Sequence, residues 1–407
     1  MMNSELEKQL EKYFDILSEY YNSEGEAFVN DDENLIVRIA MTDECDDVEL
    51  PVDRFLDYMS DLKTLRKIDH TTVRTKHIRQ TIIDTTRRGS EYIELQLSKY
   101  IYIGENFQIR VVDHPFLVGL QNAKDGNCDD NYLIWPCTGY LALELKYSDC
   151  NKLPKVEEDN LIRQILYDLT RKVGVAVYIS GFLDVYKLSD EADMEYSVSS
   201  VRVRETTVDI DTLPKSLEML DLYRQAKEIQ NPEIAYLHYY KIMEYVSQAV
   251  AKKKAIRLIN DQLNLPATVV RDFQYMDSIL TIASQYKDDQ KDDYLMNNVI
   301  QECIEVKPEL HHLPDILLSQ IKNNLGVAVN DNLTTVVLNN EKEVSLKKQV
   351  ASILYSTRNS IVHAKANYTP TGWECPKENL EEVNNMMDSL ALKMIEWNET
   401  QPEFIRL

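Results

Sequence analysis

At 407 residues the chain exceeds the length that one hydrophobic core usually serves, so two domains are expected. An apolar content of 44% is that of a globular protein, and the sequence has no run of about 18 apolar residues and no basic segment leading into an apolar one at its start. These features argue against a membrane protein and predict a cytoplasmic one. The 68 acidic residues outnumber the 45 Lys and Arg residues, and the net charge of -23 repels polyanions, so a nucleic-acid partner would need a local basic patch.

The first half of the chain alternates helical and strand patterns. Apolar residues at three-and-four spacing predict helices over 1–22, 51–62 and 159–172. Segments rich in Val, Ile, Tyr and Leu predict strands over 34–40, 92–103, 107–112, 132–135, 140–147, 173–179 and 196–208. Residues 1–212 are therefore expected to form a mixed α/β domain.

The second half changes to long stretches with helical periodicity. Helices are predicted over 213–229, 232–251, 266–286, 346–364 and 376–397. Pro232 with Glu233 and Pro376 with Glu378 place proline and an acid in a first helical turn, where both are favourable. The sequence predicts an α+β protein in which an all-α bundle, residues 213–407, follows the mixed domain.

The cysteines do not suggest a metal site or a disulfide framework. The six are scattered without a C-x-x-C pair and without a nearby His at zinc-ligand spacing. Buried free thiols are expected, and no metal or cofactor is predicted.

A compact polar group stands near the end of the helix predicted over 346–364. Arg358, Asn359 and His363 combine a permanent cation, a carboxamide and an imidazole within two turns. Asn359 and His363 are four residues apart and share a face, whereas Arg358 and His363 diverge by about 140°. Ile353, Leu354, Ile361 and Val362 are expected to supply the buried stripe of this helix.

These three residue types suit cleavage of RNA by its own 2'-hydroxyl. Imidazole titrates near neutral pH, so His363 is the candidate general base or acid. Arg358 can grip a phosphate through two hydrogen bonds, and Asn359 can orient His363 or donate to a phosphate oxygen. This reaction needs no metal, although Arg and His at this spacing on a helix also occur by chance.

The run from Arg358 to His363 resembles the R-x(4-6)-H signature of the HEPN domain family, including the polar residue that often follows the Arg. The segment from Ala235 to Tyr245 is also similar to the aromatic first helices of HEPN proteins in prokaryotic defence systems. Over about 190 residues the resemblance implies a four- or five-helix bundle that pairs as a symmetric homodimer and brings two Arg-His sets together. It implies a metal-independent endoribonuclease acting as an antiviral defence or toxin-like effector, or else an RNA-binding assembly module without turnover.

Further residues are candidates to support the motif. In such domains an acid often lies near the Arg, so Glu244 is a candidate partner for Arg358, or a solvated helix acid. Lys365, Lys347, Lys348 and the cluster from Lys252 to Arg257 could form the phosphate patch, or a solvated face. Tyr239, Tyr240 and Tyr245 could stack on unpaired bases, but at helical spacing they are more typical of core or dimer contacts.

The first half carries a second nuclease-like pattern. Glu144 and Lys146 share one face of a predicted strand, and Asp113 ends an earlier strand, an arrangement that resembles the PD-(D/E)XK nucleases. The resemblance implies a Mg²⁺-dependent DNA nuclease, and a simple Glu-Lys ion pair is the alternative. No Pro precedes Asp113 and its separation from Glu144 is long, which favours a sensor or interaction domain with its own ligand or partner.

Basic residues are concentrated in one stretch of the first half. On a shared helical face they could contact nucleic acid, and a solvent-exposed helix is the alternative. They are Arg74, Lys76, Arg79, Arg87 and Arg88.

Overall fold

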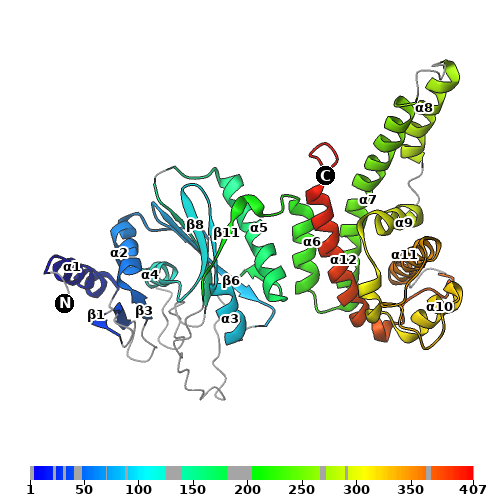
Figure 1. The fold of residues 1–407 in the computed structure, drawn as a ribbon. Coiled ribbons are helices and arrows are strands. Elements are labelled where there is room, and N and C mark those ends of the chain that lie inside the picture. The colour runs from blue at the N-terminus through cyan, green and yellow to red at the C-terminus, as the bar shows by residue number, and fades with distance from the viewer. Residues whose placement is uncertain are drawn as a thin grey trace. The chain divides into compact units, whose positions relative to one another are not determined.

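The computed structural model shows an α+β protein, which confirms the predicted fold class (Figure 1). It describes residues 4–21, 24–30, 34–40, 48–69, 71–87, 90–124, 140–149, 151–180, 204–265, 272–288, 292–363 and 368–406. The chain divides into two compact units, Met1–Leu213 and Pro214–Leu407. This division lies one residue from the boundary expected from the sequence.

Unit 1 contains two sheets and five α-helices among its described residues. The helices are α1 (Ser4–Tyr21), α2 (Val52–Asp61), α3 (Glu91–Ser98), α4 (Phe116–Lys124) and α5 (Lys155–Val173). The strands are β1 (Glu24–Val29), β2 (Leu35–Ala40), β3 (Val48–Pro51), β4 (Arg66–Lys67), β5 (Thr72–Arg74), β6 (Ile78–Thr85), β7 (Tyr100–Ile103), β8 (Phe107–Asp113), β9 (Leu141–Tyr147), β10 (Val177–Ile179) and β11 (Thr206–Asp209). Short 3-10 turns cover Leu62–Thr64 and Ile210–Thr212.

The main sheet is almost entirely antiparallel. Its strands follow the order β11-β7-β8-β9-β6-β5-β4, with β10 also paired to β6, and only the β11 to β7 pair is parallel. A smaller antiparallel sheet has the order β1-β2-β3. The register places Glu144 of β9 between Gln80 of β6 and Arg110 of β8, so these three side chains share one face.

Both faces of the main sheet are buried. Consecutive residues of a strand point to opposite faces, and the neighbours Ile82 and Ile83 enter two different hydrophobic cores. One core includes residues of α1, α2, α4 and the small sheet, and the other includes residues of α3 and α5. Figure 1 shows α4 and α5 on opposite sides of the main sheet.

The strand predicted over 92–103 is wrong in its first part, which forms helix α3. Its alternating polarity resembles a half-buried strand, but Ile93 and Leu97 lie four residues apart and are both buried in a helix packed on β8 and α5. The segment predicted over 173–179 is a strand only from Val177, because α5 runs to Val173 and ends at Gly174, whose φ of 76° suits glycine. The strand predicted over 132–135 and most of the one over 196–208 lie outside the described residues.

The basic stretch of unit 1 is not a helix. Arg74 lies on β5 and Arg79 on β6, and both form ion pairs with the buried Glu158 at the start of α5. The Arg79 Nη1 to Glu158 Oε1 distance is 2.6 Å. These two cations therefore neutralise an internal carboxylate, and they do not belong to the exposed helical face that the sequence suggested. Arg88 lies outside the described residues.

Unit 2 contains helices and no strand among its described residues. Its helices are α6 (Leu217–Glu228), α7 (Pro232–Leu263), α8 (Phe273–Asp288), α9 (Asp292–Cys303), α10 (Asp315–Leu325), α11 (Asn340–Val362) and α12 (Leu380–Thr400). Short 3-10 turns cover Lys307–His312 and Lys377–Asn379. Helices α9 and α10 were not predicted from the sequence. No helix among the described residues combines the length and the apolar character that crossing a bilayer requires.

Helix α7 is the central element of unit 2, because it packs against α6, α9, α11 and α12. Asn231 caps its N-terminus by accepting hydrogen bonds from the backbone N–H groups of Glu233 and Ile234. Its buried residues end at Val250, and the remaining 13 residues continue into a hairpin with α8. The single helix thus links the core of the bundle to this hairpin.

We predict that Ile353→Ala, in the buried stripe of α11, lowers the free energy of unfolding by about 2–5 kcal/mol, because it removes a fully buried side chain and leaves a cavity. Ile316→Ala is the matched control, since that side chain is 67% exposed on α10. Urea unfolding followed by circular dichroism measures both. Equal losses in the two variants would show that α11 does not pack as described.

Candidate functional site

The polar group predicted near the end of α11 lies at the point where that helix leaves the core. Asn339 caps the start of α11 by accepting from Lys342 N at 2.9 Å, and the helix closes where His363 N donates to Asn359 O at 2.9 Å. The buried residues of the helix end at Thr357. Ile361 is only partly buried and Val362 is 47% exposed, so the predicted stripe is correct for Ile353 and Leu354 and wrong for its last two members.

Arg358 faces helix α7. Its Nη2 lies 3.4 Å from Glu244 Oε1, its Nη1 donates to Asn359 Oδ1 at 3.1 Å, and its Cζ lies 5.7 Å from the centre of the Tyr240 ring. The pairing considered for Glu244 from the sequence is therefore present. Because the Glu244 side chain is 42% exposed and the contact is long, the pair contributes about 1 kcal/mol or less to stability.

A stack of tyrosines on α7 supports this arrangement. The rings of Tyr236 and Tyr240 are stacked with centroids 6.4 Å apart, and Tyr236 Oη donates to Leu354 O at 2.8 Å. Tyr240 Oη is buried and has no hydrogen-bond partner among the described residues. Burial, reinforced by the Glu244 carboxylate, raises the pKa of Tyr240, so its hydroxyl keeps its proton as a donor. The core interpretation holds for Tyr239 and Tyr240, which are both buried.

His363 lies apart from these contacts. It is exposed at the end of α11, and its imidazole has no hydrogen bond or ion pair within the described residues. The oxygen of Asn359 accepts from Arg358, so in this state the carboxamide orients the guanidinium. The structure brings together Arg358, Asn359, Glu244 and Tyr240, and among the described residues no hydrogen bond or ion pair joins any of them to the His363 side chain. Lys365 lies outside the described residues.

A loop that the sequence did not single out braces α11 at Ser356 and Thr357, the two residues before Arg358. Tyr368 Oη donates to Ser356 O at 3.2 Å and Thr371 Oγ1 to Ser356 Oγ at 3.0 Å, while Cys375 N donates to Thr357 Oγ1 at 2.9 Å. Glu374 holds the loop closed by accepting from Tyr368 Oη at 2.5 Å and from Thr371 N at 2.7 Å. The signal available in the sequence was the turn at Gly372, whose φ is 87°.

Glu374 carries a strongly shifted acidity. Partial burial opposes its charged form, but the hydrogen bonds from Tyr368 and Thr371 outweigh burial and lower the pKa of Glu374 to about 2. A carboxylate with a lowered pKa stabilises the fold above its usual pKa of 4.5 and loses that effect as the pH falls toward 2.

The lysines considered as a phosphate patch are largely engaged inside unit 2. Lys253 Nζ lies 2.7 Å from Glu302 Oε1, Lys254 Nζ donates to Tyr294 Oη at 2.6 Å, and Lys347 Nζ donates to Gln301 O at 3.1 Å. Lys348 is exposed on α11. The basic surface available to RNA is therefore smaller than the sequence suggests.

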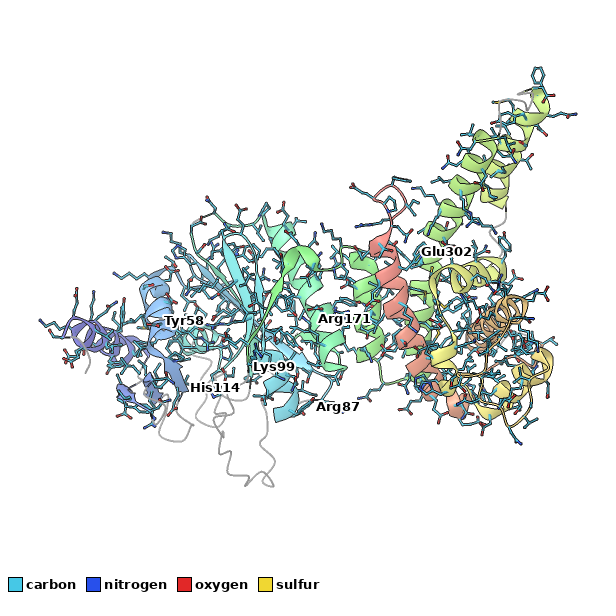
Figure 2. The ribbon with its side chains drawn as sticks, in the orientation of Figure 1. Tyr58, Arg87, Lys99, His114, Arg171 and Glu302 are labelled. Carbon is cyan, nitrogen blue, oxygen red and sulfur yellow. The ribbon has the colours of Figure 1, made fainter. Side chains whose placement is uncertain are left out.

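The nuclease-like residues of unit 1 lie on neighbouring strands but have different partners. Glu144 is 2% exposed and accepts from Tyr58 Oη, from Gln80 Nε2 at 2.8 Å and from Arg110 Nη2 at 3.3 Å (Tyr58 is labelled in Figure 2). Burial opposes its ionisation, but Arg54 and Arg110 outweigh that effect and lower the pKa of Glu144. Both carboxylate oxygens are thus occupied, which is the arrangement of an internal ion cluster.

The other two members of that pattern do not join Glu144. Lys146 forms an ion pair with Asp57 of α2, and Asp113 is 75% exposed at the end of β8, where it pairs in register with Leu141. Within the described residues no group of three His, Cys, Asp or Glu side chains could hold a metal ion. Asp113, Glu144 and Lys146 therefore do not converge on one site in the described part of unit 1.

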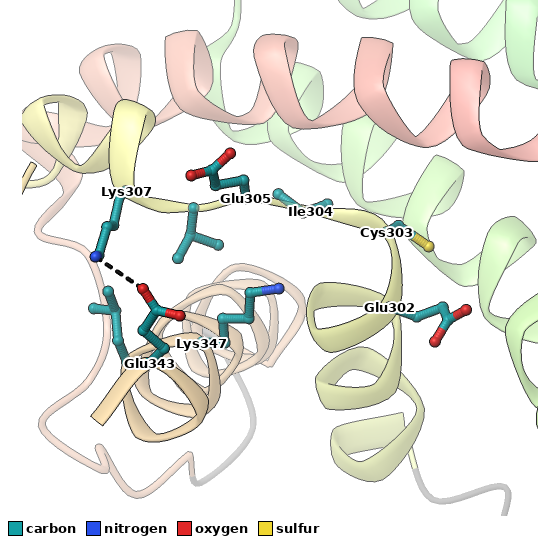
Figure 3. A pocket seen from close by; sticks show the side chains of 9 residues that line it. Glu302, Cys303, Ile304, Glu305, Lys307, Glu343 and Lys347 are labelled. Carbon is teal, nitrogen blue, oxygen red and sulfur yellow. Dashed lines mark hydrogen bonds and ion pairs between the residues drawn. The ribbon is translucent and has the colours of Figure 1, made fainter. Parts of the chain in front are cut away.

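A pocket of about 420 Å³ lies between α9, α11 and the connection to the 3-10 turn at Lys307 (Figure 3). Acids and lysines line it in nearly equal number, and Lys307 Nζ pairs with Glu343 Oε1 at 2.9 Å across it. Burial raises the pKa of its Cys303, which keeps that free thiol protonated and unreactive. Glu343 precedes Arg358 by 15 residues, about 22 Å along the helix, so this pocket is separate from the motif.

In comparisons with known proteins, no family model matches the sequence, and no curated protein or solved structure shows significant similarity to it.

We predict that Glu374→Gln destabilises unit 2 at pH 7 and that the difference from the unchanged protein shrinks as the pH falls from 4.5 toward 2, because the carboxylate of the unfolded chain takes up its proton before the folded one, whose pKa is about 2. Thermal unfolding at several pH values measures the difference. Glu381→Gln, on the exposed first turn of α12, is the control and should show little effect at any pH. A pH-independent loss in Glu374→Gln would contradict the assigned charge.

Proposed function

We propose that the protein is a metal-independent endoribonuclease whose site is formed by Arg358, Asn359 and His363. The observation that supports this proposal most strongly is the state of Arg358. Its guanidinium is oriented by Asn359 and Glu244, and 24% of its side chain is exposed. The exposed imidazole of His363 follows within two turns of the same helix. Arg has five N–H donors, so two contacts leave donors free to bind a phosphate.

The proposed reaction assigns one role to each side chain. The His363 imidazole takes the proton of the RNA 2'-hydroxyl, and the 2'-oxygen attacks the adjacent phosphorus. Arg358 stabilises the negative charge that builds on the phosphate oxygens, and Asn359 keeps the guanidinium in place. The bond to the 5'-oxygen breaks and that oxygen takes a proton from the His363 imidazolium or from water, which leaves a 2',3'-cyclic phosphate on one product and a 5'-hydroxyl on the other.

A symmetric homodimer of the second unit is part of the proposal. The resemblance to HEPN domains implies that two motifs share one cleft, and a self-complementary interface is the commonest geometry for two identical chains. In one chain the His363 side chain has no contact with Arg358. Pairing would allow the imidazole of one copy and the guanidinium of the other to approach the same phosphate.

The biological role is proposed on the resemblance alone. HEPN proteins of this type act as defence or toxin-like effectors, so we propose that unit 2 is the effector and unit 1 a regulatory or sensor domain. The net charge of -23 means that RNA would be held by a few cations near the motif, and its binding should weaken steeply with salt.

RNA binding without cleavage is the second candidate function. It is favoured by the partners of Arg358 and Asn359, which bond to each other and to Glu244 and leave the His363 imidazole without a group that orients it as a base. Under this alternative the protein retains RNA intact through Arg358 and its neighbours.

We predict that His363→Ala lowers the rate of RNA cleavage in EDTA by about 10²–10⁴-fold, the usual contribution of a general acid or base. The products of the unchanged protein should carry 2',3'-cyclic phosphate ends. His238→Ala is the control, since that His lies on α7 and bonds to Ile234 O, on a different face from Glu244. Full activity of purified His363→Ala would end the ribonuclease assignment, and RNA that is bound but uncut by the wild type would favour the second candidate.

We also predict that Arg358→Lys lowers kcat/KM by at least about tenfold, because a lysine keeps the charge but loses the two-pronged grip on phosphate. The matched control is Arg204→Lys, at an exposed position of unit 1. Steady-state cleavage of a short fluorescent RNA measures both. An equal change of kcat/KM in the two variants would show that RNA cleavage does not depend on the geometry of the Arg358 guanidinium.

A further inference from the structure

The hairpin formed by α7 and α8 carries an apolar surface that this chain does not cover. Figures 1 and 2 show the hairpin projecting from the rest of unit 2 with no other described element along α8. One face of α8 packs on α7 through Tyr275, Ile279 and Ile282, and Tyr275 Oη donates to Gln262 O at 3.0 Å. The hairpin is therefore ordered by its inner face, and its outer face requires a separate explanation.

The outer face of α8 is a continuous apolar stripe. Phe273 is 94% exposed, Met276 52% and Leu280 64%, and Ala283 is also exposed. Their spacing of three, four and three residues places them within an arc of about 80° around the axis of α8. The centre of this arc lies about 110° around the axis from the face that contacts α7. A spacing of three and four is the pattern of a helix that packs along a second helix. We call these four residues the α8 stripe.

We propose that the α8 stripe is the docking surface for a second copy of this chain, in which the two α8 helices pair antiparallel about a two-fold axis. The axis crosses the stripe at the level of residue 278, which is midway between Met276 and Leu280 and also midway between Phe273 and Ala283, while Ser278 itself lies on the opposite side of the helix. Phe273 is the largest side chain of the stripe and Ala283 the smallest, and each then faces the other across the two copies. Met276 of one copy faces Leu280 of the second copy. The stripe is thus complementary in volume to itself when reversed, which a self-complementary interface requires.

Charge disfavours a polyanion as the occupant. The exposed Asp277 borders the stripe and residues 273–284 of α8 include no Lys or Arg, so this part of the helix offers no phosphate contact to nucleic acid or anionic lipid. In the antiparallel pair the two Asp277 carboxylates lie near the two-fold axis and repel one another. Self-association should therefore tighten as the salt concentration rises, whereas a contact with a polyanion weakens.

The interface adds area from the second helix of each hairpin. Leu258 and Leu263 on α7 are 38% and 47% exposed on the same projecting hairpin, and joining two hairpins makes a four-helix arrangement. The α8 stripe spans 11 residues, about 15 Å, and five residues of α8 follow Ala283, so the tip of one hairpin reaches only partway down the other. This surface shares no residue with the motif on α11, and the proposal stands whether or not the ribonuclease activity is found.

The decisive experiment is a mixed cross-link in the full-length protein. Met276→Cys and Leu280→Cys are prepared separately, mixed and mildly oxidised, and disulfide-linked dimers are measured on a denaturing gel. Because position 276 faces position 280 of the second copy, the mixture should give several-fold more linked dimer than either variant alone. Wild-type protein under the same oxidation gives the background from its six native cysteines. Linked dimer no more abundant in the mixture than in the single variants overturns the proposal.

A charge variant tests the strength of the contact by sedimentation equilibrium. Leu280→Glu should raise the dissociation constant of this contact at least about tenfold, because two glutamates enter each interface. Ile316→Glu is the matched control, since Ile316 is similarly exposed, at 67%, but lies on α10. Unchanged association of Leu280→Glu, or cosedimentation of the wild type with neutral lipid vesicles that Leu280→Glu abolishes, counts against a second copy as the occupant.

Discussion

One buried hydrogen bond fixes the register on which the candidate site depends. Tyr236 Oη of α7 donates to the Leu354 carbonyl of α11 at 2.8 Å, in a part of the bundle where both residues are inaccessible to solvent. Leu354 precedes Arg358 by one turn, and Tyr236 precedes Tyr240 by one turn and Glu244 by two. A slip of either helix would leave the phenol unsatisfied at a cost of about 1–3 kcal/mol and would separate Arg358 from its partners.

The arginine–carboxylate clusters around Glu144 and Arg358 differ in what they leave available. In unit 1 the buried Glu144 is shared by Arg54, Arg110, Tyr58 and Gln80, so both of its oxygens are occupied. In unit 2 Arg358 has one long contact with a half-exposed carboxylate and one with a carboxamide. A buried carboxylate with both oxygens occupied stabilises a fold, whereas a long and partly exposed ion pair can exchange a partner for a ligand. This contrast is why the proposed chemistry is assigned to α11 and not to the main sheet.

The sequence predicted the long helices of unit 2 because their apolar residues repeat over many turns. It also offered Arg358, Asn359 and His363 as a candidate site, through their residue types and their resemblance to the HEPN signature, and that site stays a prediction. It failed where the pattern was short or shared by two structures. Ile93 and Leu97 fit a strand by alternation and a helix by spacing, and only their packing on β8 and α5 decides between them. Arg74 and Arg79 appeared to be a free basic face because their partner, Glu158, lies about 80 residues away in sequence. The loop at Glu374 was missed for the same reason, since its role depends on Ser356 and Thr357 in a preceding helix.

Helix α7 is an unbroken rod of 32 residues, about 48 Å long, with proline only at its first position and no glycine. Its first half carries Tyr236, Tyr240 and Glu244 in the bundle, and its last 13 residues stand outside it. Because a helix without a hinge transmits bending and rotation along its axis, a load applied at Leu263 has a continuous backbone path to the carboxylate that holds Arg358. We therefore expect a displacement of the projecting end of α7 to move Glu244 and the Arg358 guanidinium that it contacts.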